Sequence, residues 1–470
     1  MATLLSTLAT AGQALDVYQQ ALNVVQNNIT NSTTPGFATQ TLNLVAEPFD
    51  SATGLAGGVA AKGVTSARDE YAEEEVRRQA QSLGYFQAQA QGTSSIDNLF
   101  DVSGSSGVPA DLSALFQSFS AWSVSPSSAT ARQSVISSAG TLADDVQSLA
   151  NSLAGVAGDV QGQIGSTVSQ INQLTATIQQ INAQTSQGTT GPSSDALLTS
   201  SLQQLSTLVN IDTVSQADGT VTVLLQGGSP LVVGDTQYAI SAANSSAAGS
   251  QAPPSGQILD SQGNDITSQI QGGTLGGLLN VSNTILPSLI GGGQQVGSLN
   301  QFAQTFADTV NGILESGTTG PQSGAATCAA LFVYDSSDPT AAAGTLAVNP
   351  NITPDDLAPV DSSGNANGNA NQLAALASTP VASADNQSFT DFFGQIAAAV
   401  GQDSATAQEN QQAQQQVLTQ TETLRDQSSG VSLDDQASLL LQYQRSYQAA
   451  AQLLTTLNTM MDSLFEDMLT

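Results

Sequence analysis

Residues 4–29 read LLSTLATAGQALDVYQQALNVVQNNI, and apolar side chains recur through them at alternating intervals of four and three residues: Leu4, Leu8, Ala11, Leu15, Tyr18, Leu22, Val25 and Ile29. Residues 440–464 read LLQYQRSYQAAAQLLTTLNTMMDSL and repeat this alternation at Leu440, Tyr443, Tyr447, Ala450, Leu454, Leu457, Met461 and Leu464. A repeat of about 3.5 residues gives a narrow stripe that faces a partner helix. We therefore predict that the two ends of the chain pair as a coiled coil, with all other residues between them.

The charge balance is strongly acidic. Seven Lys and Arg oppose 38 Asp and Glu, which gives a formal net charge of −31. Binding to nucleic acids or to anionic lipid surfaces depends on clustered cations. We therefore expect neither kind of partner. No stretch approaches the ~20 apolar residues that span a bilayer.

Catalytic and ligand-binding patterns are missing. The chain has no His and one Cys, Cys328, so the catalytic arrangements that depend on His cannot form. The glycines of 272–277 are followed by no Lys, and Asp361–Asn369 lacks the carboxylate spacing of a calcium loop. We expect no enzyme activity, no cofactor and no bound metal, and we expect Cys328 to be a small buried side chain.

The residues between the termini divide by hydrophobic period. Helical patterns predict a rod-like helical domain from 37–208, 272–316 and 385–429, in which the pattern of 127–186 would extend roughly 90 Å. Alternating apolar residues around the turn signal Asp218-Gly219 predict a β-rich inserted domain, 209–271. Residues 317–384 are predicted as an irregular or β inserted segment, and 1–36 with 430–470 as the coiled-coil assembly domain. The expected fold is mainly α, with small inserted β segments.

Three local predictions follow from the same patterns. A helix is expected to run from the glycines near 272 to Leu314, and residues 241–256 are expected to be a linker of small residues. The charges of Glu73–Arg78 fall at intervals of three and four residues, which predicts ion pairs on a helix surface.

The sequence from Ala21 to Phe37 has a pattern of its own, namely Ala-Leu, then Gln, then Asn-Ile-x-Asn, then Thr-Pro-Gly-aromatic. It resembles the N-terminal signature of bacterial flagellar axial proteins, with Thr30 where Ala is usual and Phe37 where Tyr is usual. The matching residues are Asn28, Ile29, Asn31, Thr34, Pro35, Gly36 and Phe37. Residues 431–434 and 443–451 resemble the C-terminal signature of the same proteins.

The middle of the chain narrows this resemblance. Residues 125–135, 163–174, 218–221 and 229–234 are similar to the hook-associated protein 1 family, whereas 199–203 lack that family's charged stretch. The resemblance implies a structural component that joins the flagellar hook to the filament and polymerises through its terminal helices. It implies type III export without a cleaved signal peptide, and an extracellular place in the flagellum.

The resemblance also implies partners. They are further copies of the chain in a helical ring, the hook protein, the second hook–filament junction protein, and an export chaperone on the C-terminal helix. Two alternatives stay open, namely another axial protein such as a distal rod or hook protein, and a secreted acidic coiled-coil adhesin. The long helical pattern of 127–186 disfavours the first, and the matched stripes at both ends disfavour the second.

Overall fold

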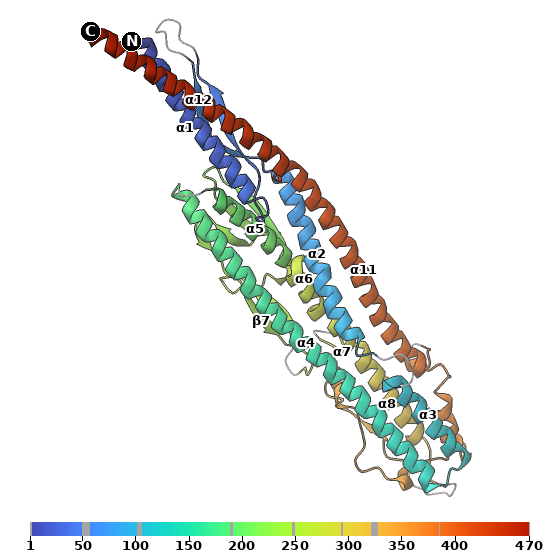
Figure 1. Cartoon of the computed structure of the whole chain (residues 1–470). Helices are drawn as coiled ribbons and strands as arrows, with labels where there is room; N and C mark the ends of the chain where they lie inside the picture. Colours follow the sequence, from blue (N-terminus) through green and yellow to red (C-terminus); the bar gives the residue numbers. More distant parts are fainter. Residues whose placement is uncertain are drawn as a thin grey trace.

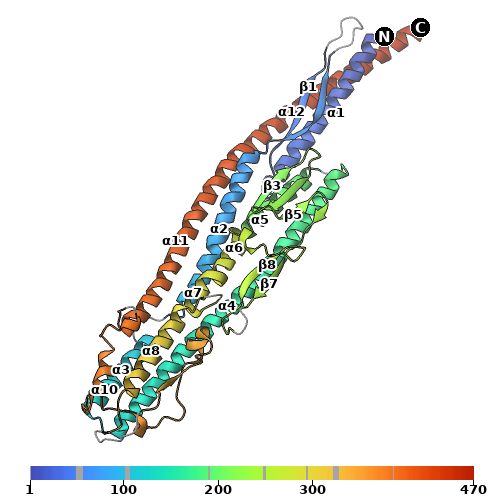
Figure 2. The ribbon, with the colours of Figure 1, turned by 180° about the vertical axis from the view of Figure 1, so that it is seen from behind.

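The computed structural model describes residues 2–48, 57–100, 106–188, 191–246, 250–292, 295–320, 328–384 and 386–469. The molecule is an elongated rod, with a thin arm at the end that carries both termini (Figures 1 and 2). Most described residues are helical, and the strands form small antiparallel sheets. The predicted fold class, mainly α with small β segments, is confirmed.

The helices are α1 (Ala2–Thr30), α2 (Glu70–Asp97), α3 (Gly107–Val124), α4 (Ala129–Ser186), α5 (Pro192–Leu208), α6 (Gly273–Asn280), α7 (Leu286–Ile290), α8 (Ser298–Glu315), α9 (Ala342–Thr345), α10 (Gly368–Ala375), α11 (Phe389–Ser429) and α12 (Leu433–Leu469). The strands are β1 (Gln40–Ala46), β2 (Val59–Ser66), β3 (Ile211–Ser215), β4 (Val221–Leu225), β5 (Pro230–Val233), β6 (Thr236–Gln237), β7 (Ser241–Ser245), β8 (Ser255–Leu259), β9 (Phe332–Val333) and β10 (Ala347–Val348).

Helix α4 is the longest helix described and runs along the rod (Figure 1). It is one helix of 58 residues, which corresponds to roughly 87 Å, and it occupies the longest helical pattern of the sequence. The Ser128 hydroxyl begins it by accepting a hydrogen bond from the N–H of Ala131. Its apolar face, from Val135 to Ile181, is buried along the whole length.

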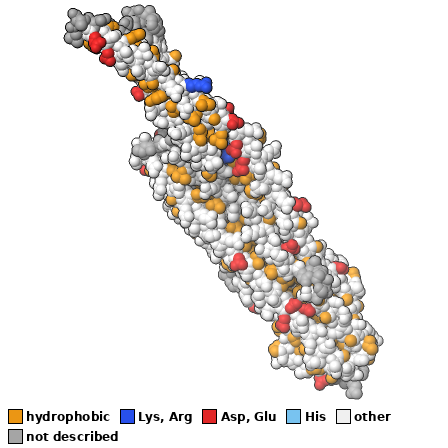
Figure 3. All heavy atoms as spheres, in the orientation of Figure 1, with side chains coloured by type: hydrophobic (Ala, Val, Ile, Leu, Met, Phe, Trp, Pro, Cys, Tyr) orange, Lys and Arg blue, Asp and Glu red, His pale blue; other side chains and the backbone are white. Residues whose placement is uncertain are grey.

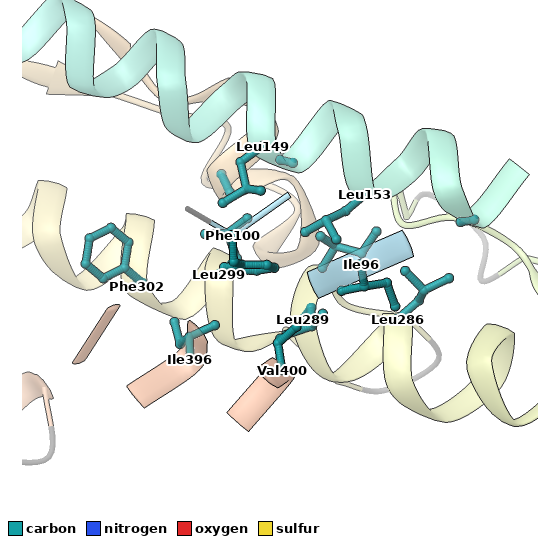
Figure 4. Packing of buried hydrophobic residues seen from close by; sticks show 14 of the residues in the cluster. Ile96, Phe100, Leu149, Leu153, Leu286, Leu289, Leu299, Phe302, Ile396 and Val400 are labelled. Atoms are coloured by element: carbon teal, nitrogen blue, oxygen red, sulfur yellow. The ribbon is translucent and has the colours of Figure 1, made fainter. Parts of the chain in front are cut away.

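The hydrophobic core lies where α2, α4, α7, α8 and α11 meet. Figure 4 shows side chains from all these helices converging, among them Ile96, Leu153, Leu289 and Val400. Towards the far end, Phe302 stacks on Phe306 with 6.0 Å between ring centroids, and rings from α11 pack against both. Burial of such rings is the largest apolar contribution to a core.

The prediction of one helix from about 272 to Leu314 is wrong. After α6 the chain makes a π-helical turn at Val281–Ile285, continues as α7, and breaks before α8. Pro287 explains the turn, because proline has no N–H for the usual bond and its ring collides with the carbonyl four residues earlier. Gly291 and Gly297, with φ of 83° and 84°, then end α7 and begin α8 in a conformation that other residues avoid.

The prediction of a linker at 241–256 is also wrong. Residues 241–245 form β7, which pairs with β8 in an antiparallel hairpin, and β3, β4, β5 and β6 form a separate antiparallel sheet. The sequence Ser-Ala-Ala-Asn-Ser shows no apolar alternation. Its strand conformation follows from the neighbouring strand and not from its own side chains.

Asparagines on helices attach the strands to the rod. In each case one side-chain amide accepts a hydrogen bond from a backbone N–H and donates one to the C=O of the same residue. In Asn182 these bonds to Val221 are 2.9 and 2.8 Å long. The other amides of this kind in the body are Asn172 on Ile240, Asn283 on Gly256 and Asn311 on Phe332. We call these residues amide clamps.

Residues 317–384 contain the two short strands β9 and β10, together with α9 and α10, within their described part. The Asp361 carboxylate accepts hydrogen bonds from within its own loop, namely from the backbone N–H groups of Ser363 and Asn365 and from the Asn365 side-chain amide. Cys328 is buried, and its burial raises the thiol pKa to about 11. The thiol therefore stays protonated at neutral pH.

The contact between Asp111 of α3 and Asp145 of α4 should make the stability of the fold depend on pH. Partial burial and the hydrogen bond with Asp145 raise the pKa of Asp111 to about 6. The folded protein holds the proton of Asp111 more tightly than the unfolded chain does, so protonation favours the folded state. This contribution is complete below about pH 4 and is lost as the pH rises through about 6. We expect Asp111→Asn to be more stable than the parent at pH 8, by at most about 1 kcal/mol because the pair is partly hydrated.

Urea denaturation of both proteins at pH 4 and pH 8 measures this difference. Asp144→Asn, one residue from Asp145 and exposed, is the control and should change little at either pH. Equal stabilities of the parent and Asp111→Asn at pH 8 would contradict the prediction.

Candidate functional site

The arm consists of α1, α12 and the β1–β2 hairpin. Helices α1 and α12 lie side by side and run in opposite directions, so that both termini are at the tip (Figures 1 and 2). The hairpin packs along α1 as well. The two stripes predicted from the sequence therefore belong to one antiparallel pair.

The stripe of α1 is only partly covered. Ala11 and Val25 are buried, and Leu8, Leu15, Tyr18, Leu22 and Ile29 are half-buried. Leu4 lies in α1, but its side chain is outside the described residues. Val17 and Ala21, which the spacing did not select, are buried too, because α1 contacts the hairpin in addition to α12.

The stripe of α12 follows the heptad closely. Leu457 is buried. The other covered positions of the stripe are half-buried, and each has a more exposed residue next to it in the sequence: Leu440, Tyr443, Tyr447, Ala450, Leu454 and Met461. Leu464, nearest the tip, is exposed. One seam thus runs along α12 from Leu440 to Met461.

A second apolar strip of α12 has no cover in the single chain. Leu453 and Met460, seven residues apart on one face, are about half exposed, and Leu441 and Phe465, which lie on other faces of α12, are similarly open. The molecular surface in Figure 3 shows hydrophobic side chains along the arm and where the arm meets the body. An isolated soluble helix pair would expose fewer large apolar residues in one region.

Asn28 joins three elements at the base of the arm. Its side chain is 1% exposed and forms an amide clamp, accepting from the N–H of Gln40 (3.0 Å) and donating to its C=O (2.8 Å). The same amide nitrogen donates to Oε1 of Gln436 in α12, at 2.9 Å. Asn28 therefore ties the end of α1 to both β1 and α12.

The loop after α1 contains the other residues of the sequence signature. The Asn31 amide donates to the carbonyl of Asn27, and Thr34 donates its hydroxyl proton to Asn31. Thr34 and Pro35 are exposed, whereas Phe37 is half-buried. This loop borders a cleft of about 470 Å³, whose other side is lined by Glu73, the end of α11 and residues 430–432.

Gly36 is required at its position for two reasons. Its φ is +76°, which favours glycine, and a Cβ atom there would come within 2.5 Å of the carbonyl oxygen of Ala196 in α5. Its own carbonyl accepts a hydrogen bond from Nη2 of Arg68 at 2.8 Å. The loop is thereby pressed against the body of the rod.

A buried charge network lies under this loop. Arg68, whose side chain is 7% exposed, contacts Glu73 at 3.0 Å and Asp195 of α5 at 2.8 Å. The other oxygen of Glu73 lies 3.7 Å from Arg425 of α11. The prediction of surface pairing is therefore wrong for Glu73, since its side chain is only 4% exposed, and holds for Arg78 with Glu75.

Sequence patterns did not select Arg68, Glu73, Arg425 or Gln436 as site residues. The scarcity of cations was the one available signal, because four of the seven Lys and Arg lie at 68, 77, 78 and 425. Such grouping is unexpected for surface charges alone. Of these four, Arg68 and Arg425 lie in the network where the arm meets the body, whereas Arg78 is exposed.

Within the described ranges, every helix is too short or too polar to cross a bilayer. In the same residues, no group of three or more acidic or Cys side chains is arranged to hold a metal ion.

Comparison with known proteins gives matches over two parts of the chain. The model of the flagellar hook-associated protein FlgK helical domain matches residues 93–327, and that of the flagellar basal body rod FlgEFG protein C-terminal region matches 425–466. Flagellar hook-associated protein 1 of Bacillus subtilis (strain 168) is 27% identical over 146 residues, which are 29% of this chain and 29% of that protein.

A solved structure is also similar, the flagellar hook junction protein FlgK from Burkholderia pseudomallei. It shares 24% identity with a TM-score of 0.46, over 55% of this chain and 46% of that one. The chain thus spans less than half the length of these relatives. The FlgK helical-domain model covers half of the 470 residues, from the end of α2 past α8, and its match agrees with the resemblance seen in the sequence. The chain belongs to the FlgK family of flagellar hook-associated proteins.

Proposed function

We propose that this chain is a structural component of the bacterial flagellum that joins the hook to the filament and polymerises through its arm. The observation that carries this proposal is the arm itself, an antiparallel helix pair with a second apolar strip left open. Neighbouring copies that pack side by side would cover Leu453 and Met460, as the partner helix covers the seam.

The proposed partners follow from the same role. Copies of the chain would form a helical ring, with the hook protein on one side and the second junction protein on the other. Before assembly, an export chaperone would cover the apolar strips of α12. The chain would reach its extracellular place by type III export, without a cleaved signal peptide.

The net charge of −31 constrains such a ring, because adjacent copies repel one another. The arm reduces this repulsion, since its seam and open strip consist of apolar and amide side chains. Contacts of this kind are many and individually weak, which suits a joint that transmits torque between two different neighbours. The role is mechanical and needs no catalytic group.

A distal rod or hook protein is the second candidate, favoured by the match of 425–466 to the rod-protein C-terminal model. The helical-domain match over 93–327, which contains all of α4, supports the junction role instead.

Deleting the gene separates these functions. A junction component predicts cells that build hooks, lack attached filaments and release unpolymerised filament subunits into the medium, whereas loss of a rod component would remove the hooks too. Electron microscopy of the cells and immunoblotting of the medium measure both results, and a plasmid copy of the gene is the control. Filaments that persist in the deletion strain would reject the proposal and favour the adhesin.

A further inference from the structure

The apolar repeat of the arm does not by itself determine how far α1 and α12 overlap. Starting at the Asn28–Gln436 bond and moving equally along both antiparallel helices, Val25 comes level with Leu440, and Ala11 with Leu454, to within one residue. A slip of one heptad would bring Ala11 level with Met461 and would again place apolar residues opposite apolar residues. That slip would move the helices by about 10 Å.

The Asn28–Gln436 pair distinguishes the native overlap from the slipped one, which the apolar repeat alone does not. Gln436 is 4% exposed, and within the seam it faces an amide that is itself buried. This slip would move α12 away from the tip, so that Asn28 would be level with Tyr443 and Gln436 would lie past the end of α1. Both amides would then lose this hydrogen bond, and a buried amide without its partner disfavours a state by roughly fivefold or more.

Asn28 cannot follow a slipped helix. Its two bonds to the backbone of Gln40 hold the amide in place, because β1 is paired with β2 and packs on α1. The Asn28 amide is therefore fixed in the arm. Its N–H finds an acceptor on α12 only in the overlap that brings Gln436 level with Asn28. A single buried polar residue in a coiled coil is a known means of fixing register.

We propose that Asn28 and Gln436 are the specificity-determining pair that sets the register of α1 against α12. The role of this register in a ring rests on the proposed function, since copies can pack in a regular ring only if every arm has the same overlap. The pair does not drive the association of the helices, which the apolar seam does. It selects one of several overlaps that the seam would accept.

Disulfide trapping on the purified full chain tests the register directly, in a background in which Cys328 is replaced by Ser. One protein carries Ala11→Cys with Leu454→Cys, which reports the native overlap, and another carries Ala11→Cys with Met461→Cys, which reports the slipped one. Each trapped disulfide records the overlap at the moment the helices meet. The ratio of slipped to native disulfide is then measured with Gln436 intact and with Gln436→Met.

Gln436→Met keeps the length of the side chain and removes the acceptor, so the ratio should rise at least about fivefold. Gln442→Met, the same change at an exposed position of α12, is the matched control and should have no effect.

An unchanged ratio in Gln436→Met, or equal native and slipped disulfides in the parent, would overturn the proposal. The assay uses single chains and is independent of assembly. If the disulfides show one preferred register but the gene deletion leaves filaments attached, the proposed function is rejected and the role of Asn28 and Gln436 in setting the register stands.

Discussion

The substitution Leu454→Asp is expected to abolish incorporation of the chain into flagella and to reduce motility to that of the gene deletion. Leu454 lies in the middle of the α12 seam, level with Ala11, where a large side chain fills the space beside a small one. A carboxylate at this half-buried position would lose part of its hydration without gaining a cation, which is unfavourable. The core among α2, α4, α8 and α11 contains no arm residue, so the body should stay folded.

Isolated flagella probed by immunoblot, together with swimming assays, measure incorporation, and circular dichroism with thermal unfolding of the purified chain checks the body. The neighbouring Thr455→Asp adds the same charge at an exposed position and should assemble. Normal motility of Leu454→Asp, or equal loss in both variants, would argue against the seam.

Gly36→Ala is expected to loosen the junction between arm and body and to destabilise the chain by at least about 2 kcal/mol. About 1 kcal/mol or more comes from placing a Cβ at positive φ, and the overlap with the carbonyl of Ala196 adds to it. If the loop moves away from α5, the Gly36 carbonyl leaves Arg68, and the buried network of Arg68, Glu73 and Arg425 opens.

Trypsin reports this opening, because it cleaves after Lys and Arg and the chain has only seven of them. Cleavage after Arg68 and Arg425 should be at least about tenfold faster in Gly36→Ala than in the parent. Gly12→Ala, in the middle of α1 where a Cβ meets nothing within 4 Å, should match the parent or be slightly more stable. Equal cleavage of both variants would show that Gly36 is not needed to close the junction.

The sequence was most informative where a periodic pattern and a structural element have the same length. The helical pattern of 127–186, two apolar runs with one phase slip between them, predicted one long helix. The matched stripes at the two ends predicted that α1 and α12 face each other. The direction of that pair was not predictable, because a heptad is the same read from either end. It follows from the chain entering and leaving the body at one junction.

The remaining features depend on contacts that spacing does not encode. The break around Pro287 was missed because the apolar pattern continues across it, and β7 was missed because its conformation comes from β8. Glu73 appeared to belong to a surface run of charges, and only the approach of α11 buries it against two guanidinium groups. Asn28 was selected by resemblance, but nothing in the sequence pointed to Gln436 as its partner.

The amide clamps have a consequence for the medium in which the molecule works. An asparagine amide neither gains nor loses a proton over the physiological range, and its hydrogen bonds are not ion pairs that dissolved salt would screen. The attachments made by Asn172, Asn182, Asn283 and Asn311 should therefore keep the same strength in dilute, saline or mildly acidic surroundings. Strands held in this way need no compartment that controls pH or ionic strength.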